Sequence, residues 1–296
     1  MTRRGWLLFA AMCVIWGIPY LLIKVAVEEL SPAVLVLVRT AIGALLLLPL
    51  AGARNELRPL LRYWAPVLVF AAIEIALPWL LLGAAEQRIS SSLAALVIGA
   101  VPLVGAMIAR TTGPRERLGL QSGLGLLLGV GGVAAIVGVN VGGAGLWPIA
   151  AVGLIAICYA VGPAIVQRHL NDAPALGVIA VSLAVTALVY VPIGAWSMPD
   201  GWPSADVIGS ALGLAVVCTA LAFVFFFALI DEAGPVRATV ITYVNPAVAA
   251  ALGVAILGEP FSVAMGIGFV LVLVGSVLAT RRPAVAPTQA RASLGR

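Results

Sequence analysis

Long apolar runs separated by short polar breaks dominate the chain. Each run holds about 20 residues, the length that a helix needs to cross ~30 Å of hydrocarbon. The ten predicted spans are Gly5–Val27, Pro32–Gly52, Tyr63–Ala84, Ser90–Ala109, Gly119–Gly138, Trp147–Gln167, Pro174–Trp196, Val207–Ile230, Val236–Leu257 and Ser262–Thr280. The alternating strands of a membrane barrel are absent from the sequence, so the pattern predicts an all-α integral membrane protein.

The last two spans form the clearest hairpin, Val236–Thr280, with the polar break Gly258-Glu259-Pro260. A weaker copy lies between Arg88 and Val137, at an offset of about 143 residues. The matched positions share one register to within one residue: Pro102 with Pro246, Glu116 with Glu259, and Gly123, Gly125 and Gly132 with Gly266, Gly268 and Gly275. This register predicts an internal duplication.

The duplication has a consequence for membrane topology. Each copy, residues 5–138 and 147–280, contains five spans, and an odd number of crossings makes the second copy enter the membrane from the opposite side. Inverted repeats recur in secondary transporters, because exchanging the conformations of the two halves opens a central site to one side and then the other. The sequence therefore predicts two inverted five-helix repeats around a solute site.

Composition supports the membrane assignment and excludes several other classes. The chain is 62% hydrophobic and only 10% charged, too little polar surface for a soluble protein of this size. Its net charge of +5 follows the loops rather than a nucleic-acid site: with a cytoplasmic N terminus, 14 of the 17 basic residues lie on the inner side. We expect both termini to be cytoplasmic, the membrane to be the inner (cell) membrane, and residues 281–296 to be a disordered tail.

The first 27 residues also resemble a signal peptide, with Arg3 and Arg4 before an apolar run. That run is longer than a usual signal core, and its removal would leave nine spans, so a retained first helix is favoured. Cys13, Cys158 and Cys218 lie inside apolar runs without metal-ligand spacing, which predicts small packing residues that face either lipid or the core. We expect no metal site, no cofactor and no enzymatic activity.

Glu74 lies near the middle of the third span. A charged, unpaired carboxylate at that depth costs at least ~3 kcal/mol, so it should face a cavity, pair with a cation or carry a proton. Two interpretations stay open: a proton-coupling or substrate-amine site, and a neutral acid that hydrogen-bonds within the helix bundle.

Arg39 in the second span is the matching basic group. It could bind a substrate carboxylate, pair with Glu74, or extend to the outer headgroups, and its modest depth favours the last. Lys24, near the outer end of the first span, is likewise expected to extend to the headgroups.

A bend is predicted in the first span at Trp16-Gly17-Ile18-Pro19-Tyr20. Tyr159 stands at the equivalent position of the sixth span, before Gly162-Pro163. Two Gly/Pro-interrupted spans at equivalent places indicate a central binding site. The candidate lining residues here are Trp16, Pro19, Tyr20 and Tyr159, with Trp79 added by the third span.

The ninth span offers a polar face made of Thr239, Thr242, Tyr243 and Asn245. Pro246 cannot donate to the carbonyl of Thr242, and a freed carbonyl can serve a solute or a neighbouring helix. Pocket lining is favoured for this face. In the fifth span, Gly125, Gly129, Gly131 and Gly132 predict close helix packing instead.

Several short motifs occur in a familiar order: Trp16-Gly17 with Lys24, Ser31-Pro32 with Arg39, Pro246, and Gly258-Glu259-Pro260 with the glycines after it. In this the chain resembles the EamA family of the drug/metabolite transporter superfamily over about residues 5–280. The first repeat departs from the pattern at Gly113–Glu116. The resemblance implies an inner-membrane carrier, often an exporter of amino acids or other small metabolites, that works by alternating access.

We therefore expect an exporter of amino acids or related small metabolites, with proton coupling through Glu74 as a hypothesis. Its partners are a small-molecule solute and membrane lipids, without nucleic acid, and it is a monomer or a homodimer. Because relatives in the superfamily move solutes from cationic drugs to nucleotide sugars, an exporter of cationic drugs is the alternative. From other classes, a non-transporting sensor or assembly subunit stays open, whereas a lipid-cleaving enzyme lacks a paired nucleophile and base.

Overall fold

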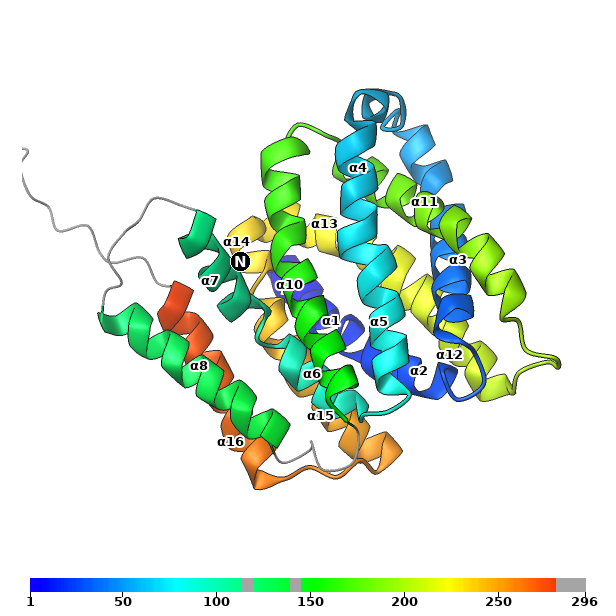
Figure 1. Ribbon diagram of the computed structural model, residues 1–296. Coiled ribbons are helices and arrows are strands. Elements are labelled where there is room, and N and C mark those ends of the chain that lie inside the picture. Colours follow the sequence, from blue (N-terminus) through cyan, green and yellow to red (C-terminus); the bar gives the residue numbers. More distant parts are fainter. Residues whose placement is uncertain (113–119, 139–144, 281–296) are drawn as a thin grey trace, which may run out of the picture.

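The computed structural model describes residues 1–112, 120–138 and 145–280, which are helical and connected by short turns (Figure 1). In these ranges nine helical stretches are long and apolar enough to cross a membrane, and α15 (Ile241–Leu257) is a shorter apolar helix. All ten predicted spans are therefore found as helices. The Gly113–Glu116 turn and the predicted tail lie outside the described residues.

The first five spans contain α1 (Arg3–Ile15), α2 (Ile18–Ala26), α3 (Pro32–Ala53), η1 (Arg58–Tyr63), α4 (Trp64–Phe70), η2 (Ala71–Ala76), α5 (Leu77–Glu86), α6 (Ser91–Ile98), α7 (Val101–Thr112) and α8 (Leu120–Gly138). The last five contain α10 (Leu146–His169), α11 (Ala175–Trp196), α12 (Ala205–Ala215), η3 (Val216–Leu221), α13 (Ala222–Ala233), α14 (Pro235–Ala238), α15 and α16 (Val263–Thr280).

The predicted bend in the first span is present, because α1 ends at Ile15 and α2 begins at Ile18. The prediction of a matching interruption in the sixth span was wrong, because α10 continues through Pro163. A proline is tolerated inside a membrane helix when neighbouring groups satisfy the freed carbonyl. The fourth span is divided instead, between α6 and α7, and the ninth is divided between α14 and α15.

The third and eighth spans, which are equivalent in the two repeats, each contain a π-helical turn. One is Ala71–Ala76, which carries Glu74, and the other is Val216–Leu221. Pro78 follows the first turn and cannot donate to the Glu74 carbonyl, which removes one α-helical bond there. Such turns widen a helix by one residue and often occur at functional sites.

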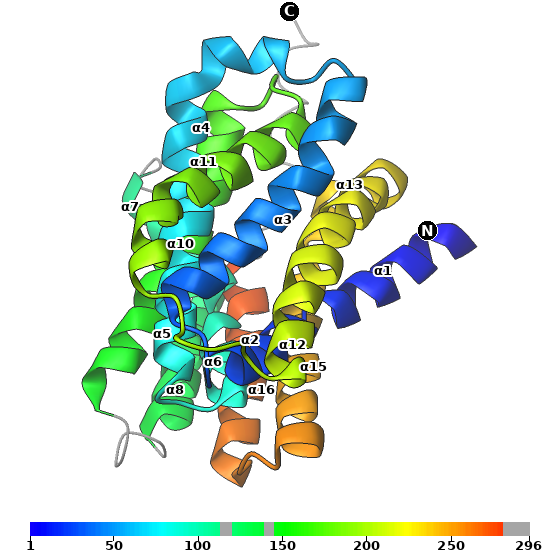
Figure 2. The same cartoon turned by 90° about the vertical axis from the view of Figure 1, so that its right-hand side faces the viewer.

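Helices pair across the repeats in a pattern that a two-fold axis requires. The closest pairs are α8 with α16 and α3 with α11, followed by α6 with α15 (Figures 1 and 2). The contact of α5 with α10 has its counterpart in α2 with α12. Exchanging the two repeats converts these pairs into one another, as expected for inverted copies.

Glycines allow the α8–α16 pair to approach closely. A Cβ added at Gly132 would lie 2.5 Å from the carbonyl oxygen of Gly268, and one at Gly275 would lie 2.5 Å from the amide nitrogen of Gly129. The predicted packing role is confirmed for Gly132, Gly129 and Gly125. It was wrong for Gly131, which has nothing within 4 Å because it points away from α16.

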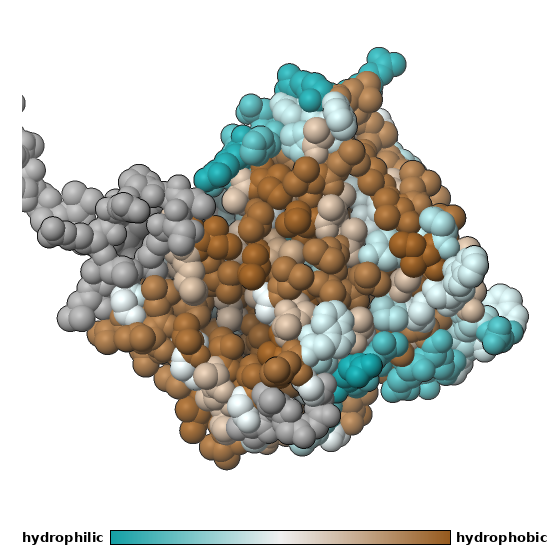
Figure 3. Space-filling model, viewed as in Figure 1, coloured by the Kyte–Doolittle hydropathy of each residue, from teal (hydrophilic) through white to brown (hydrophobic). Residues whose placement is uncertain are grey.

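The surface has the character of a protein surrounded by lipid. Figure 3 shows a broad hydrophobic face between hydrophilic groups at the top and the lower right. Leucines on the long helices are strongly exposed, as Leu45, Leu127 and Leu188 illustrate. A surface this apolar is unfavourable in water, so the chain is a multi-pass membrane protein. Its three cysteines are buried, so of the two positions predicted for them, facing lipid or facing the core, they take the second.

Candidate functional site

Arg39 on α3 is buried inside the bundle, with 7% of its surface exposed. Its guanidinium carbon lies 3.5 Å from the centroid of the Trp79 ring, and its Nε donates a hydrogen bond to Thr219 Oγ1, 2.8 Å away. The prediction that Arg39 extends to the headgroups was wrong, because an aromatic face and a hydroxyl replace water around it. Thr219 belongs to the π-turn of the second repeat, so Arg39 joins the two halves.

Glu74 packs against Gly162 of α10. A Cβ added at Gly162 would lie 1.8 Å from Glu74 Oε2, so only glycine leaves room for this carboxyl group. Among the described residues Oε2 has no hydrogen-bond partner. Within that part of the chain the ion pair between Glu74 and Arg39, one of the options raised by the sequence, is not formed.

Two tyrosines lie near these charged groups. Tyr159 of α10 is within electrostatic range of both Glu74 and Arg39, and its hydroxyl faces the Trp79 indole N–H. Tyr20 of α2 is within range of Arg39 and Tyr159. We call Tyr20, Arg39, Glu74, Trp79 and Tyr159 the central cluster. It combines a fixed cation, a carboxyl group and aromatic faces from both repeats, a combination able to hold a zwitterion.

Trp16 and Pro19 lie at the break in the first span. The Trp16 ring packs against Phe223 and Phe226 of α13, with centroids 6.0 and 4.7 Å apart. Pro19 is buried in the first turn of α2. Packing around the bend thus explains both residues, and the ring contacts of Trp16 do not join it to the central cluster.

The ninth-span candidates are arranged differently from one another. Thr239 and Thr242 are exposed, with the Thr242 hydroxyl donating to the Thr239 carbonyl at 2.8 Å, and Tyr243 is partly buried. Asn245 is buried. Its side-chain amide lies next to two backbone carbonyls, so the amide nitrogen is assigned to that position. There it donates to the carbonyl of Ile241 at 2.9 Å and to the carbonyl of Cys13 at 3.1 Å. It therefore ties α15 to the end of α1, and pocket lining is the weaker explanation.

Lys24 does not extend to the headgroups, contrary to the prediction. Its Nζ donates to the backbone carbonyls of Glu86 at 2.5 Å and Ile89 at 2.9 Å, which lie at the C-terminal end of α5. Cations are favoured at that end of a helix. Sequence reasoning overlooked Glu86, because an acid at the end of a span looks like a loop residue.

The sequence places Glu259 in a loop and indicates no role for it, but in the structure its side chain hydrogen-bonds to the first residues of α6. Its carboxylate accepts hydrogen bonds from the Ser91 amide at 2.7 Å and from the amide and hydroxyl of Ser92 at 2.9 and 2.5 Å. Burial would raise the pKa of Glu259, but the bonds from Ser92 and Ser91 outweigh it and lower the pKa below its ordinary value. The serine run before an apolar helix was the available signal.

Two cavities open at the end of the bundle where the α2–α3, α5–α6 and α11–α12 connections lie. The first, of about 350 Å³, is lined by Lys24, Val27, Glu28, Glu86 and Gln87. The second, of about 520 Å³, lies between α3, α12 and residues 198–203 and is mostly apolar. Neither is lined by the central cluster, in which the Arg39 guanidinium covers the Trp79 ring.

Comparison with known proteins gives a consistent result. The model of the EamA-like transporter family matches residues 3–138 and again residues 146–281. The "Uncharacterized inner membrane transporter YedA" of Escherichia coli K12 is 30% identical over 294 residues, covering 94% of this chain and 93% of that protein. The "Uncharacterized transporter YvbV" of Bacillus subtilis is 25% identical, covering 92% and 90%. A crystal structure with 21% identity shares the fold, with a TM-score of 0.66 over 95% of this chain and 97% of that one.

Proposed function

Because this chain belongs to the EamA-like transporter family and is thus a membrane transporter, we propose that it exports amino acids or related small metabolites across the inner membrane by alternating access. The observation that carries the proposal is the central cluster, which holds a buried guanidinium and a carboxyl group that do not pair with each other.

The two charged groups suit the two ends of an α-amino acid. Among the described residues Arg39 donates a hydrogen bond only from Nε, to Thr219, so the rest of its planar donor fork is available there for a carboxylate. Glu74 supplies an acceptor for the solute ammonium group. The faces of Tyr20, Trp79 and Tyr159 favour an apolar side chain, such as that of an aromatic or branched amino acid.

Proton coupling through Glu74 is part of the proposal. A carboxylate packed on Gly162, with no partner for Oε2 among the described residues, is unfavourable when charged, so the resting group holds a proton. An arriving ammonium group would displace that proton. The test is Glu74→Gln, assayed for flux in right-side-out and inverted vesicles with and without a pH gradient. Unchanged dependence on the gradient rules out this role for Glu74.

The solute class is tested with purified protein. A thermal-shift screen of amino acids, sugars and cationic dyes detects ligands through their stabilisation of the native state. Counterflow in proteoliposomes then measures transport, and we expect saturable, stereoselective exchange of an aromatic or branched amino acid. Absence of flux for every stabilising ligand would favour a sensor.

A second candidate function, export of cationic compounds, is favoured by one feature of the same site. Glu74 and the aromatic groups Trp79 and Tyr159 could together hold an organic cation. Transport of cationic dyes without transport of amino acids would select this alternative. For the orientation, we propose cytoplasmic termini, because the basic residues then lie on the inner side.

A further inference from the structure

Glu86, the last residue of α5, is fully buried, with 0% of its surface exposed. Among the described residues only Arg39 and Glu86 are charged side chains in the buried class. Arg39 has Thr219 and Trp79 as partners, whereas neither oxygen of the Glu86 carboxyl has a hydrogen-bond partner in the described ranges. A carboxylate in such a place is strongly disfavoured, and a neutral carboxyl group is not.

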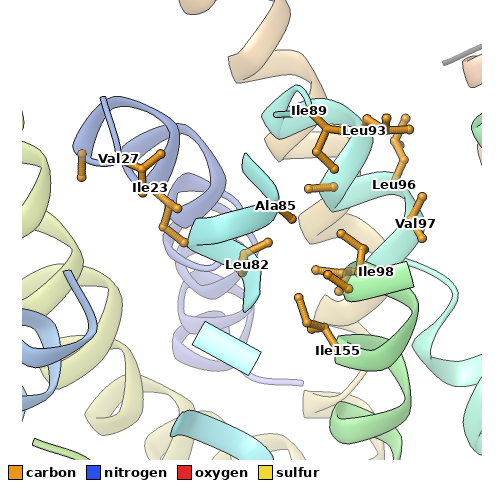
Figure 4. Close-up of a cluster of buried hydrophobic side chains, with 14 of the residues drawn as sticks. Ile23, Val27, Leu82, Ala85, Ile89, Leu93, Leu96, Val97, Ile98 and Ile155 are labelled. Atoms are coloured by element: carbon orange, nitrogen blue, oxygen red, sulfur yellow. The ribbon is translucent and has the colours of Figure 1, made fainter. Parts of the chain in front are cut away.

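The surroundings of Glu86 also favour a neutral carboxyl group over a carboxylate. Ile23, Leu82, Ala85 and Ile89 belong to the apolar cluster formed where α2, α5 and α6 meet (Figure 4). Glu86 also stands at the C-terminal end of α5, where the helix dipole disfavours negative charge.

Three titratable groups face Glu86 from other elements: Lys24 and Tyr20 on α2, and Glu259 before α16. Lys24 is the only cation among them, and its Nζ bonds the backbone carbonyl of Glu86 rather than its carboxyl group. Glu259 is engaged by Ser91 and Ser92 and adds like charge. These groups leave the Glu86 carboxyl without a charge partner in the observed arrangement.

Glu86 borders a cavity of about 350 Å³ together with Lys24, Glu28 and Gln87, so water can come close to its side chain, although none of its own surface is exposed in this arrangement. We propose that Glu86 is a proton-binding site of the carrier, filled from this cavity and separate from Glu74. On release, the proton passes to water in the cavity and leaves a carboxylate beside Lys24. The ammonium group of Lys24 then turns from the carbonyls of Glu86 and Ile89 to the carboxylate, which loosens α2 from the α5–α6 turn.

In the orientation proposed above, the cavity opens to the outer side, where an exporter driven by proton entry must take up its proton. The inference thus deepens the proposed function, but its test needs no solute. The full chain in lipid nanodiscs is studied by infrared spectroscopy in a Glu74→Gln background, which removes the carbonyl band of the other acid that lies within the helix bundle. Failure of the Glu86 test therefore leaves the amino-acid flux assay unaffected.

We expect a carbonyl band of a protonated carboxylic acid that fades as the pH rises and shifts when the sample is transferred to D2O. Glu86→Gln should remove this band, and Glu86→Asp should move it. Glu28→Gln is the matched control, since Glu28 lines the same cavity but is exposed, and it should leave the band unchanged. Lys24→Met should extend the band to higher pH, because the cation that would stabilise the carboxylate is gone.

Two results would overturn the proposal. A band unaffected by Glu86→Gln and Glu86→Asp means that Glu86 is ionised, and a band that does not shift in D2O means that no proton reaches it from the cavity. Loss of the Lys24→Met effect would refute the exchange of partners.

Discussion

At the scale of single residues, the two charges of the central cluster are kept in the bundle by different means. Arg39 is stabilised by the Trp79 face and the Thr219 hydroxyl, and a stacked, hydrogen-bonded guanidinium stays charged. Glu74 packs with Oε2 against Gly162, and among the described residues this oxygen has no hydrogen-bond partner. Charge changes during transport are therefore expected at the acid rather than at the arginine.

Gly162→Ala tests whether the position of Glu74 matters. The added Cβ would lie 1.8 Å from Oε2 and must displace the carboxyl group, so we expect solute transport to fall at least about tenfold, the loss that a misplaced polar contact of about 1.4 kcal/mol produces. Counterflow in proteoliposomes measures the loss.

Gly153→Ala is the matched control for this change, because it lies on the same helix and has nothing within 4 Å. Both substitutions add the same helix propensity, about 1 kcal/mol. Equal transport by the two variants would show that the contact between Gly162 and Glu74 is irrelevant.

At the scale of helices, the sequence predicted all ten spans because lipid exposure requires long, unbroken apolar runs. The bend at Trp16-Gly17 was also predictable, since Pro19 cannot donate a backbone hydrogen bond. The spans and the bend depend on local chemistry alone. The predicted division of the chain into residues 5–138 and 147–280 likewise uses only the order of the apolar runs along the sequence.

The partners of individual side chains could not be predicted. Arg39, Lys24 and Glu259 each bond an element far away in the sequence, and only the packed bundle brings those elements together. The π-turns were missed for a similar reason: apolar periodicity in a fully apolar helix does not reveal a one-residue change of turn. Pro163 shows the reverse error, since a residue that ends helices in water is tolerated inside the bundle.

The α8–α16 pair makes a sharp prediction about packing. In Gly132→Ala the new Cβ would meet the Gly268 carbonyl at 2.5 Å, backbone that cannot yield without separating the helices. We expect a loss of about 1–3 kcal/mol of stability, typical of overpacking. Gly131→Ala, one residue away and facing open space, should be neutral or slightly stabilising. Thermal unfolding in detergent compares them, and equal midpoints would contradict the close approach.

Glu259 predicts how stability depends on pH at the start of α6. Hydrogen bonds from Ser92 and Ser91 hold the pKa of Glu259 below its ordinary value despite burial, so its contribution is present above that value and is lost as the pH falls through the folded pKa. Glu259→Gln should lower the free energy of unfolding by about 1 kcal/mol near neutral pH, a value that already allows for the partial exposure of the side chain. The variant should also lose less stability than the wild type when the pH falls below about 4.

Thermal unfolding over a pH series measures this effect. Glu28→Gln is the control, because that side chain is exposed and belongs to a different connection. If Glu259→Gln has the same pH dependence as the wild type, the carboxylate does not hold α6.

At the scale of the whole molecule, the helix pairs map onto themselves when the repeats are exchanged. The contacts that join α3 to the eighth span are matched by those that join α11 to the third. In inverted-repeat transporters the second state arises when the two halves exchange conformations, and the observed symmetry of the helix pairs is what such an exchange requires. This supports alternating access around the central cluster.

Inversion of the repeats predicts which surface positions share a side of the membrane. Arg54 follows the second span of its repeat and Asp200 follows the second span of the other, so equivalent loops should lie on opposite faces. The same holds for Arg88 and Asp231 after the third and eighth spans. All four side chains are exposed, and the native cysteines are buried, so single cysteine substitutions should give a clear labelling signal.

With cytoplasmic termini, a membrane-impermeant maleimide added to intact cells should label Arg88→Cys and Asp200→Cys, whereas Arg54→Cys and Asp231→Cys should require inverted vesicles. Reversal of both pairs would refute only the orientation, but labelling of Arg54→Cys and Asp200→Cys from the same side would refute the inversion itself and with it the symmetric exchange on which alternating access rests.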